Sequence, residues 1–151
     1  MRRYAERTEV TSDHSIAEIR RVLSRYGAGQ FAYMEDPLRA AVAFNCNGRN
    51  IRFILPMPSA DESAKTPQGR KRKGTVIEQV HAQEVRRRWR ALSLSIKAKL
   101  ETVQSGIAEF ETEFMAYTVL PNGKTVAENI LPDIERAYST GKMTKLLEAL
   151  E

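Results

Sequence analysis

Lysine and arginine side chains concentrate in one stretch of this 151-residue sequence. Residues 65–99 contain eleven Lys or Arg and two Asp or Glu, although the whole chain carries a formal net charge of only +5. The flanking segments 1–64 and 100–151 carry +1 and −5. Clustered cations attract polyanions, because each can neutralise a phosphate and release its counterions. The stretch therefore predicts a nucleic-acid-binding surface.

The cations of this stretch fall into two groups. Four are consecutive, from Arg70 to Lys73, in a polar segment with a proline and two glycines that predicts a flexible loop ordering on its ligand. The others lie in a segment of helical periodicity: Arg86, Arg87, Arg88, Arg90, Lys97 and Lys99. The loop residues Arg70, Lys71, Arg72 and Lys73 are thus candidate phosphate contacts, and Arg52, in an expected strand, is a weaker candidate. Because phosphate contacts carry no base information, we expect binding without sequence preference.

Of the two groups, the helical one is favoured as the main surface, since a rigid row can contact several phosphates together. Arg86, Arg90 and Lys97 share one side of the expected helix.

Residues suited to catalysis or metal binding are sparse. His14 and His81 have no serine or cysteine nucleophile placed with them, and Cys46 stands beside a predicted turn. One cysteine and two histidines exclude an internal disulfide framework and zinc-site spacing. Glu109 and Glu113 share a helix face and could hold Mg²⁺, but nearby lysine partners are expected to be absent, and the acidic region is far from the basic one in sequence. We predict no catalytic residue, metal ligand or cofactor.

The first half of the chain predicts a helix followed by an antiparallel sheet. Apolar residues recur at helical spacing over 13–26, and short strands are expected at 30–34, 40–46 and 49–55. Asn47-Gly48 between the last two strands predicts a two-residue hairpin turn, because both central residues need positive φ. That turn pairs Phe44 with Ile51 and Val42 with Phe53, and these four side chains are expected in the core.

The opposite face of this hairpin carries small side chains around an arginine. Its residues are Ala41, Ala43, Asn45, Asn50, Arg52 and Ile54. Such a face could admit either a phosphate backbone or a packed helix, and the sequence leaves both open.

A long amphipathic helix is expected from about residue 76. Apolar residues step by three or four up to Tyr117, which corresponds to about 40 residues or ~60 Å. The helix therefore either breaks near Ser105-Gly106 or projects and needs a partner to cover its stripe, which favours a homo-oligomer. Trp89 lies on the stripe and is expected in the core rather than stacked on bases; Phe31 and Tyr33 are interpreted likewise.

Short helices complete the expected α+β fold. Thr125 and Glu128 form a capping-box pattern, a helix is expected to start at Pro132 and run through Tyr138, and a final helical turn is expected at 143–150. The chain divides into a helix and sheet over 1–58, a basic flexible loop over 59–75, and the long and C-terminal helices over 76–151, all taken as one domain. No apolar run reaches the ~20 residues of a membrane span, and the N-terminus lacks a signal peptide's apolar stretch, so a cytoplasmic protein is expected.

Four segments carry a resemblance to known proteins: residues 25–28 (RYGA), 49–56 (RNIRFILP), 88–92 (RWRAL) and 96–101 (IKAKLE). They resemble an uncharacterised family of bacteriophage and prophage proteins, which implies a mobile-element origin and a bacterial host cytoplasm but no particular activity. The element order is also similar to that of single-strand annealing recombination proteins of the Rad52 and RecT kind, and of double-stranded RNA-binding domains. Both bind nucleic acid without reading its sequence.

The resulting hypothesis is a non-sequence-specific nucleic-acid-binding protein, with DNA favoured over RNA, that acts in phage or prophage DNA metabolism and handles single strands during recombination. One alternative is a protein-interaction module, such as an inhibitor of a host defence complex or an assembly factor, whose basic face meets an acidic protein. A second alternative is a small metal-dependent nuclease that uses Glu109 and Glu113.

Overall fold

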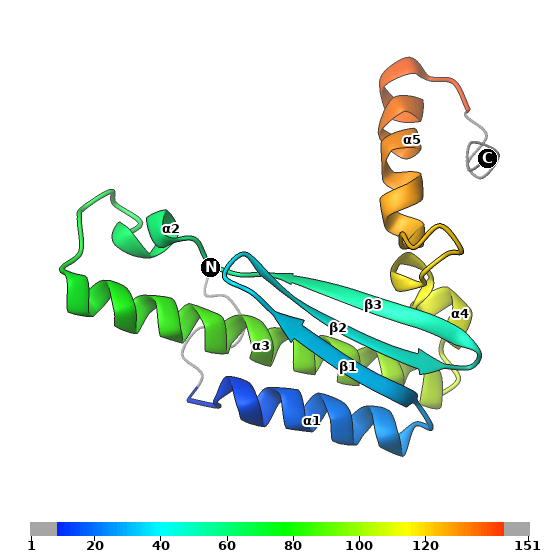
Figure 1. Ribbon diagram of the computed structural model, residues 1–151. Helices are drawn as coiled ribbons and strands as arrows, with labels where there is room; N and C mark the ends of the chain where they lie inside the picture. Colours follow the sequence, from blue (N-terminus) through cyan, green and yellow to red (C-terminus); the bar gives the residue numbers. More distant parts are fainter. Residues whose placement is uncertain (1–8, 144–151) are drawn as a thin grey trace.

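The computed structural model describes residues 9–143 and shows the expected α+β fold. An N-terminal helix is followed by a three-stranded antiparallel sheet, a long helix and short C-terminal helices (Figure 1). The elements are α1 (Ser12–Arg25), β1 (Gly29–Glu35), β2 (Arg39–Cys46), β3 (Arg49–Pro56), α2 (Ala60–Ala64), α3 (Gly74–Gln104), α4 (Phe110–Glu113), the 3₁₀ turn η1 (Met115–Tyr117) and α5 (Val126–Thr140). In the described chain no helix is long and apolar enough to cross a membrane.

The hairpin β2–β3 has the predicted turn and register. Asn47 and Gly48 both have positive φ, at 52° and 69°, as a two-residue hairpin turn of this kind requires. Phe44 pairs with Ile51 and Val42 with Phe53, and all four side chains are buried. Strand β1 joins the other edge of β2, giving the order β1-β2-β3.

Helices α1 and α3 lie side by side on one face of the sheet and close the core (Figure 1). Ile19 and Leu23 of α1 meet Trp89 and Ile96 of α3 over the buried faces of β2 and β3. These residues recur every three or four positions, so each helix presents one apolar side to the sheet. Trp89 is fully buried, as expected for a core residue.

The long helix breaks near Ser105-Gly106, which decides between the two expectations for its length. Helix α3 ends at Gln104, and Gly106 adopts a left-handed φ of 72° that most side chains disfavour. The chain then turns back, and Phe114 packs edge-on against Phe44 and Phe53 while Tyr117 stacks on Phe53 at 4.1 Å between ring centroids. The apolar period continues past the break because both parts of the stripe reach the same core.

Helix α5 projects from the end of the molecule where α3 finishes (Figure 1). It begins at Val126 behind a capping box formed by Thr125 and Glu128, so the predicted start at Pro132 is wrong, and that proline lies inside the helix. The capping box supplies acceptors and donors to the free backbone groups of the first turn, which fixes the earlier start. The helical turn expected at 143–150 falls almost entirely outside the described residues.

The segment predicted as a featureless basic loop, 59–75, contains secondary structure. Helix α2 starts after Ser59, whose hydroxyl accepts a hydrogen bond from the Glu62 amide. A tight turn follows, in which Lys65 and Lys71 form an antiparallel bridge.

Candidate nucleic-acid interface

The tight turn at 65–73 displays cations on an ordered backbone. The Thr66 amide donates to the Arg70 carbonyl at 2.8 Å, and the Arg72 amide donates to the Ala64 carbonyl at 2.9 Å. Lys65, Arg70, Lys71 and Lys73 are exposed, and in the described chain none of them has an ion-pair partner. Residues 65–77 contain no Asp or Glu. We call residues 65–73 the basic turn.

The basic turn leads directly into the N-terminus of α3. Lys73 is the N-cap residue, no side chain caps this helix end, and its first turn holds no acidic residue. The first amides of a helix lack intrahelical acceptors and carry partial positive charge, so they favour an anion. This helix end and the exposed cations therefore create positive potential in the same place.

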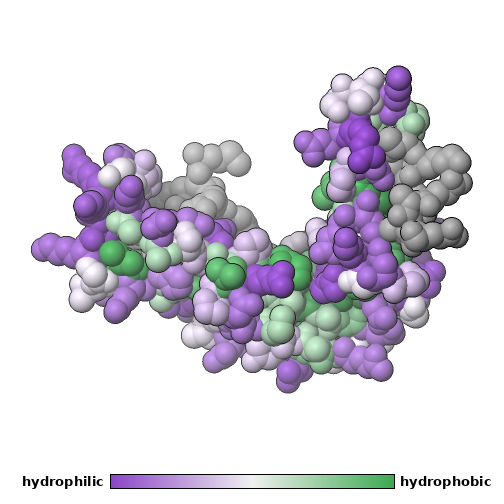
Figure 2. Space-filling model, turned by 45° about the horizontal axis from the view of Figure 1, so that its top comes forward, coloured by the Kyte–Doolittle hydropathy of each residue, from purple (hydrophilic) through white to green (hydrophobic). Residues whose placement is uncertain are grey.

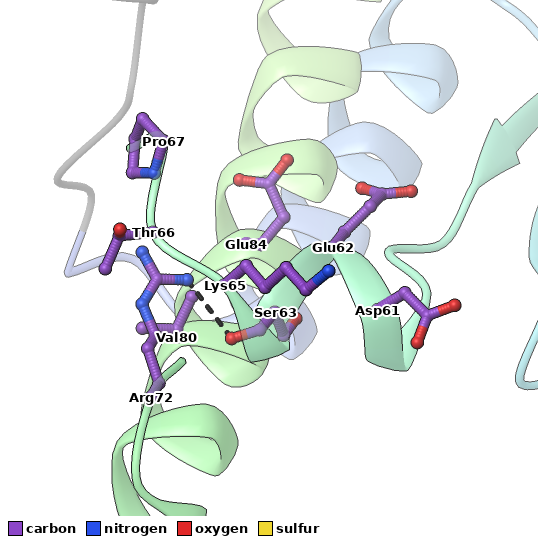
Figure 3. Close-up of a pocket in the computed structure, with 9 residues that line it drawn as sticks. All are labelled: Asp61, Glu62, Ser63, Lys65, Thr66, Pro67, Arg72, Val80 and Glu84. Carbon is purple, nitrogen blue, oxygen red and sulfur yellow. Dashed lines mark hydrogen bonds between the residues drawn. The ribbon is translucent and has the colours of Figure 1, made fainter. Parts of the chain in front are cut away.

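One cation of the tract, Arg72, points inward instead. Its Nη1 donates to the Ser63 carbonyl at 3.1 Å, beside a cavity of about 370 Å³ between α2, the basic turn and α3 (Figure 3). Asp61, Glu62 and Glu84 line this cavity together with Lys65 and Arg72 (Figure 3). A cavity lined by both acidic and basic side chains does not favour a polyanion as its ligand. Arg72 therefore holds the basic turn against α2 and is removed from the candidate contact residues.

The same region contains a serine–histidine contact that the sequence interpretation missed. Ser63 Oγ lies 3.4 Å from His81 Nδ1, so the expectation that no serine is placed with either histidine is wrong. The two residues are 18 positions apart, on α2 and α3, and no spacing rule joins them. Ser63 is only 2% exposed, and its hydroxyl docks α2 on α3.

Of the predicted row of Arg86, Arg90 and Lys97 on α3, Arg90 lies at the seam with α1. Arg90 Nη1 donates to Glu18 of α1 at 2.6 Å, and Arg86 Nη2 donates to Gln83 at 2.6 Å. Lys97 is exposed. Two of the three side chains are thus committed to contacts within the protein, and the row is less free for phosphates than its spacing suggested.

Arg87 and Arg88, on the other side of α3, are also held by carboxylates. Arg87 forms a two-fold hydrogen-bonded pair with Glu84, at 2.8 and 2.7 Å. Arg88 donates to Glu84, to Glu62 of α2 and, at 2.7 Å, to the Pro56 carbonyl at the end of β3. Its side chain is 17% exposed. Arg88 is therefore a structural link between α2, α3 and the sheet.

Lys99 pairs with a carboxylate of the alternative metal site. Its Nζ lies 3.2 Å from Glu113 and 5.2 Å from the centroid of the Tyr117 ring. The assumption that no lysine lies near Glu109 and Glu113 is thus wrong, since the turn after α3 brings α4 back alongside it. Among residues 9–143 no group of three or more His, Cys, Asp or Glu side chains could hold a metal ion.

Arg52, the weaker candidate on the sheet, is occupied by the start of α5. Its Nη2 donates to the Gly123 carbonyl at 2.9 Å and to Glu128 at 3.0 Å. The Thr125 amide donates to the same carboxylate at 2.6 Å, and this bond, with the Arg52 charge, holds the pKa of Glu128 below its ordinary value of 4.5. Arg52 thus fixes α5 to the sheet and is not available to a phosphate.

The lowered pKa of Glu128 predicts a pH dependence of stability. The carboxylate stabilises the fold fully above its ordinary pKa, and this contribution is lost as the pH falls through the lower pKa of the folded state. We expect the Glu128→Gln variant to unfold at lower denaturant concentration at neutral pH, with the difference shrinking as the pH falls below the ordinary pKa of 4.5 and through the lower pKa of the folded state. Urea unfolding at a series of pH values measures this. A constant difference across the series would contradict the assignment.

Among the aromatic and thiol candidates, Tyr33 is exposed, whereas Phe31 is partly buried and Cys46 is buried. Phe31 is partly buried against the core. Tyr33 packs edge-on against the core residue Trp89 but is 47% exposed, so it lies at the edge of the core rather than inside it. Cys46 is buried, which raises the pKa of its thiol and keeps it in the unreactive protonated form.

The chain matches no protein-family model, and neither a curated protein nor a solved structure is significantly similar to it.

Proposed function

We propose that this protein binds nucleic acid without sequence preference through the basic turn, with DNA favoured over RNA. The observation that carries the proposal is the exposed set Lys65, Arg70, Lys71 and Lys73, which stands on a hydrogen-bonded turn within a stretch, residues 65–77, that contains no Asp or Glu. Four cations at one end of the molecule match the repeating charge of a phosphate backbone.

The N-terminus of α3 supports the same assignment. Its unpaired amides can donate to a phosphate while Lys73, at the cap position, adds a full charge beside them. Contacts of these two kinds position a protein on a backbone and do not read bases. The bacteriophage resemblance gives a bacterial host cytoplasm as the setting. The element order, which is similar to that of single-strand annealing proteins, gives the handling of single strands during recombination as the task.

A salt series tests the proposal. Four phosphate contacts predict that the logarithm of the association constant falls with the logarithm of salt concentration at a slope of about −3 to −4. Fluorescence anisotropy with labelled single-stranded and double-stranded DNA and RNA of one sequence measures the slope and the preferred strand type. A second sequence of equal length should bind within about two-fold, because backbone contacts are independent of bases.

The same titration distinguishes nucleic-acid binding from the alternative function, a protein-interaction module. Absence of binding to all of these nucleic acids at low salt would overturn the proposal. If the protein binds an acidic protein more tightly than any of these nucleic acids, the basic turn is assigned to a protein partner instead.

A further inference from the structure

Helix α5 carries an apolar stripe that no other part of the described chain covers. Its members are Ala127, Ile130, Leu131, Ile134 and Tyr138, spaced by three or four residues along one side of the helix. Leu131 is 59% and Tyr138 is 89% exposed, and α5 contains no buried residue. Among the described elements, α5 packs on η1 and is joined to β3 by the Arg52–Glu128 ion pair, which lies outside the stripe.

The stripe continues into a shallow groove at the base of the helix. Met115 and Ala116 of η1 and Val126 of α5 form it with members of the stripe, and its lining is entirely apolar, with a volume of about 220 Å³. Figure 2 shows the arm formed by α5 rising from the body, with hydrophobic residues at its surface. Solvent-exposed apolar patches of this kind mark interaction sites on proteins.

The charged side chains of α5 lie outside the stripe, so the stripe can pack against the same stripe of a second copy. Glu128 pairs with Arg52, and Asp133 pairs with Arg136 at 2.8 Å. Glu135 is the acidic residue of this helix that remains without an ion pair in the described chain, and it lies beside the stripe rather than on it. Two copies of the helix can therefore approach face to face without opposing rows of like charge.

We propose that α5 pairs with α5 of a second copy of this chain around a two-fold axis near Leu131. In an antiparallel pair, Tyr138 of each copy reaches the groove beside Met115 of the other. Tyrosine and methionine are enriched at protein interfaces, where the ring adds area and the thioether adapts its shape.

The exposed area of the stripe is sufficient for a weak, reversible pair. At roughly 200 Å² for a fully exposed large side chain, Met115, Leu131, Ile134 and Tyr138 expose on the order of 500 Å² in one copy. A two-fold contact uses the surface twice and buries about 1,000 Å², which is below the range of stable interfaces and matches a weak, transient one. The dimer is accordingly expected to be in exchange with monomer.

Sedimentation across a concentration series, without nucleic acid, tests the pairing. We expect a reversible monomer–dimer equilibrium that the Leu131→Glu variant weakens about 30-fold or more, as for a central interface residue. Ile107→Glu is the matched control, because Ile107 is 79% exposed and lies in the turn after α3, away from the stripe. Circular dichroism confirms that both variants fold. A wild-type monomer throughout the series, or equal effects of the two variants, overturns the proposal.

A crosslinking experiment determines what the stripe contacts. Under mild oxidation, Leu131→Cys should form a disulfide-linked dimer far faster than Ile107→Cys, since the two-fold axis places each Leu131 beside its copy. If Leu131→Cys instead crosslinks only to a copy carrying Ala43→Cys, the helix docks on the open face of the sheet and the α5–α5 pairing is wrong. This pairing is independent of the basic turn, so loss of nucleic-acid binding leaves it unaffected.

Discussion

Neutralising Arg70, Lys71 and Lys73 together, each to alanine, is expected to lower the affinity for nucleic acid about 100-fold near physiological salt. Each lost phosphate contact removes close to one unit of the salt slope, so the slope should fall by about 3. Because these side chains are exposed and have no ion pairs in the described chain, the variant should be as stable as the unaltered protein. Anisotropy titrations with and without added salt give both quantities.

The matched control changes the net charge equally on the long helix. Arg86, Arg90 and Lys97 are replaced by alanine, and we expect a small loss of affinity but a measurable loss of stability, because the Arg90–Glu18 pair is broken. Equal losses of affinity in the two variants would show that the basic turn has no special role and that the overall charge dominates. A larger loss in the helix variant would restore the row on α3 as the binding surface.

Replacing Trp89 with alanine is expected to lower the free energy of unfolding by about 3–5 kcal/mol. The side chain is fully buried between the helices and the sheet, and its removal leaves a cavity among Leu92, Ile96 and the edge of Tyr33. A loss of this size is a large share of the 5–15 kcal/mol typical of a domain. Since Trp89 is the one tryptophan in the sequence, unfolding must be followed by circular dichroism rather than by indole fluorescence.

Trp89→Phe provides the control for this substitution. Nε1 of Trp89 has no hydrogen-bond partner in the described structure, so phenylalanine removes an unpaired buried donor while it keeps most of the ring. The phenylalanine variant should therefore retain much more stability than the alanine variant. A loss below about 1 kcal/mol for Trp89→Ala would contradict the central position of this residue in the core.

The fold was predictable to the extent that it depends on neighbours in sequence. The Asn47-Gly48 turn fixes its own register within two residues, and the apolar period of α1 follows from local spacing. The break after Gln104 was harder, because Phe110 and Phe114 keep the helical period although the chain has turned back. The apolar period predicts which side chains are buried in the core. It does not predict the direction in which the chain runs there.

The candidate site was less predictable because its charges are compensated over long distances in sequence. Glu18 neutralises Arg90 from 72 residues away, and Glu62 reaches Arg88 from 26. A count of charges by segment assigns these carboxylates to an almost neutral N-terminal part and leaves the arginines of α3 as apparent excess. The basic turn, in contrast, contains no Asp or Glu, and Arg70, Lys71 and Lys73 have no ion pair in the described chain, so the same count describes these three cations well.

The apolar core ends well before the described chain does. Every buried hydrophobic residue among positions 9–143 lies between Ile16 and Phe114, whereas α5 begins at Val126. Under the proposed α5–α5 pairing, folding and assembly are thus encoded in separate stretches of sequence. Substitutions on the stripe of α5 can change the choice of partner without a cost in folding, so this helix is free to diverge between relatives while the sheet and its two covering helices stay constrained.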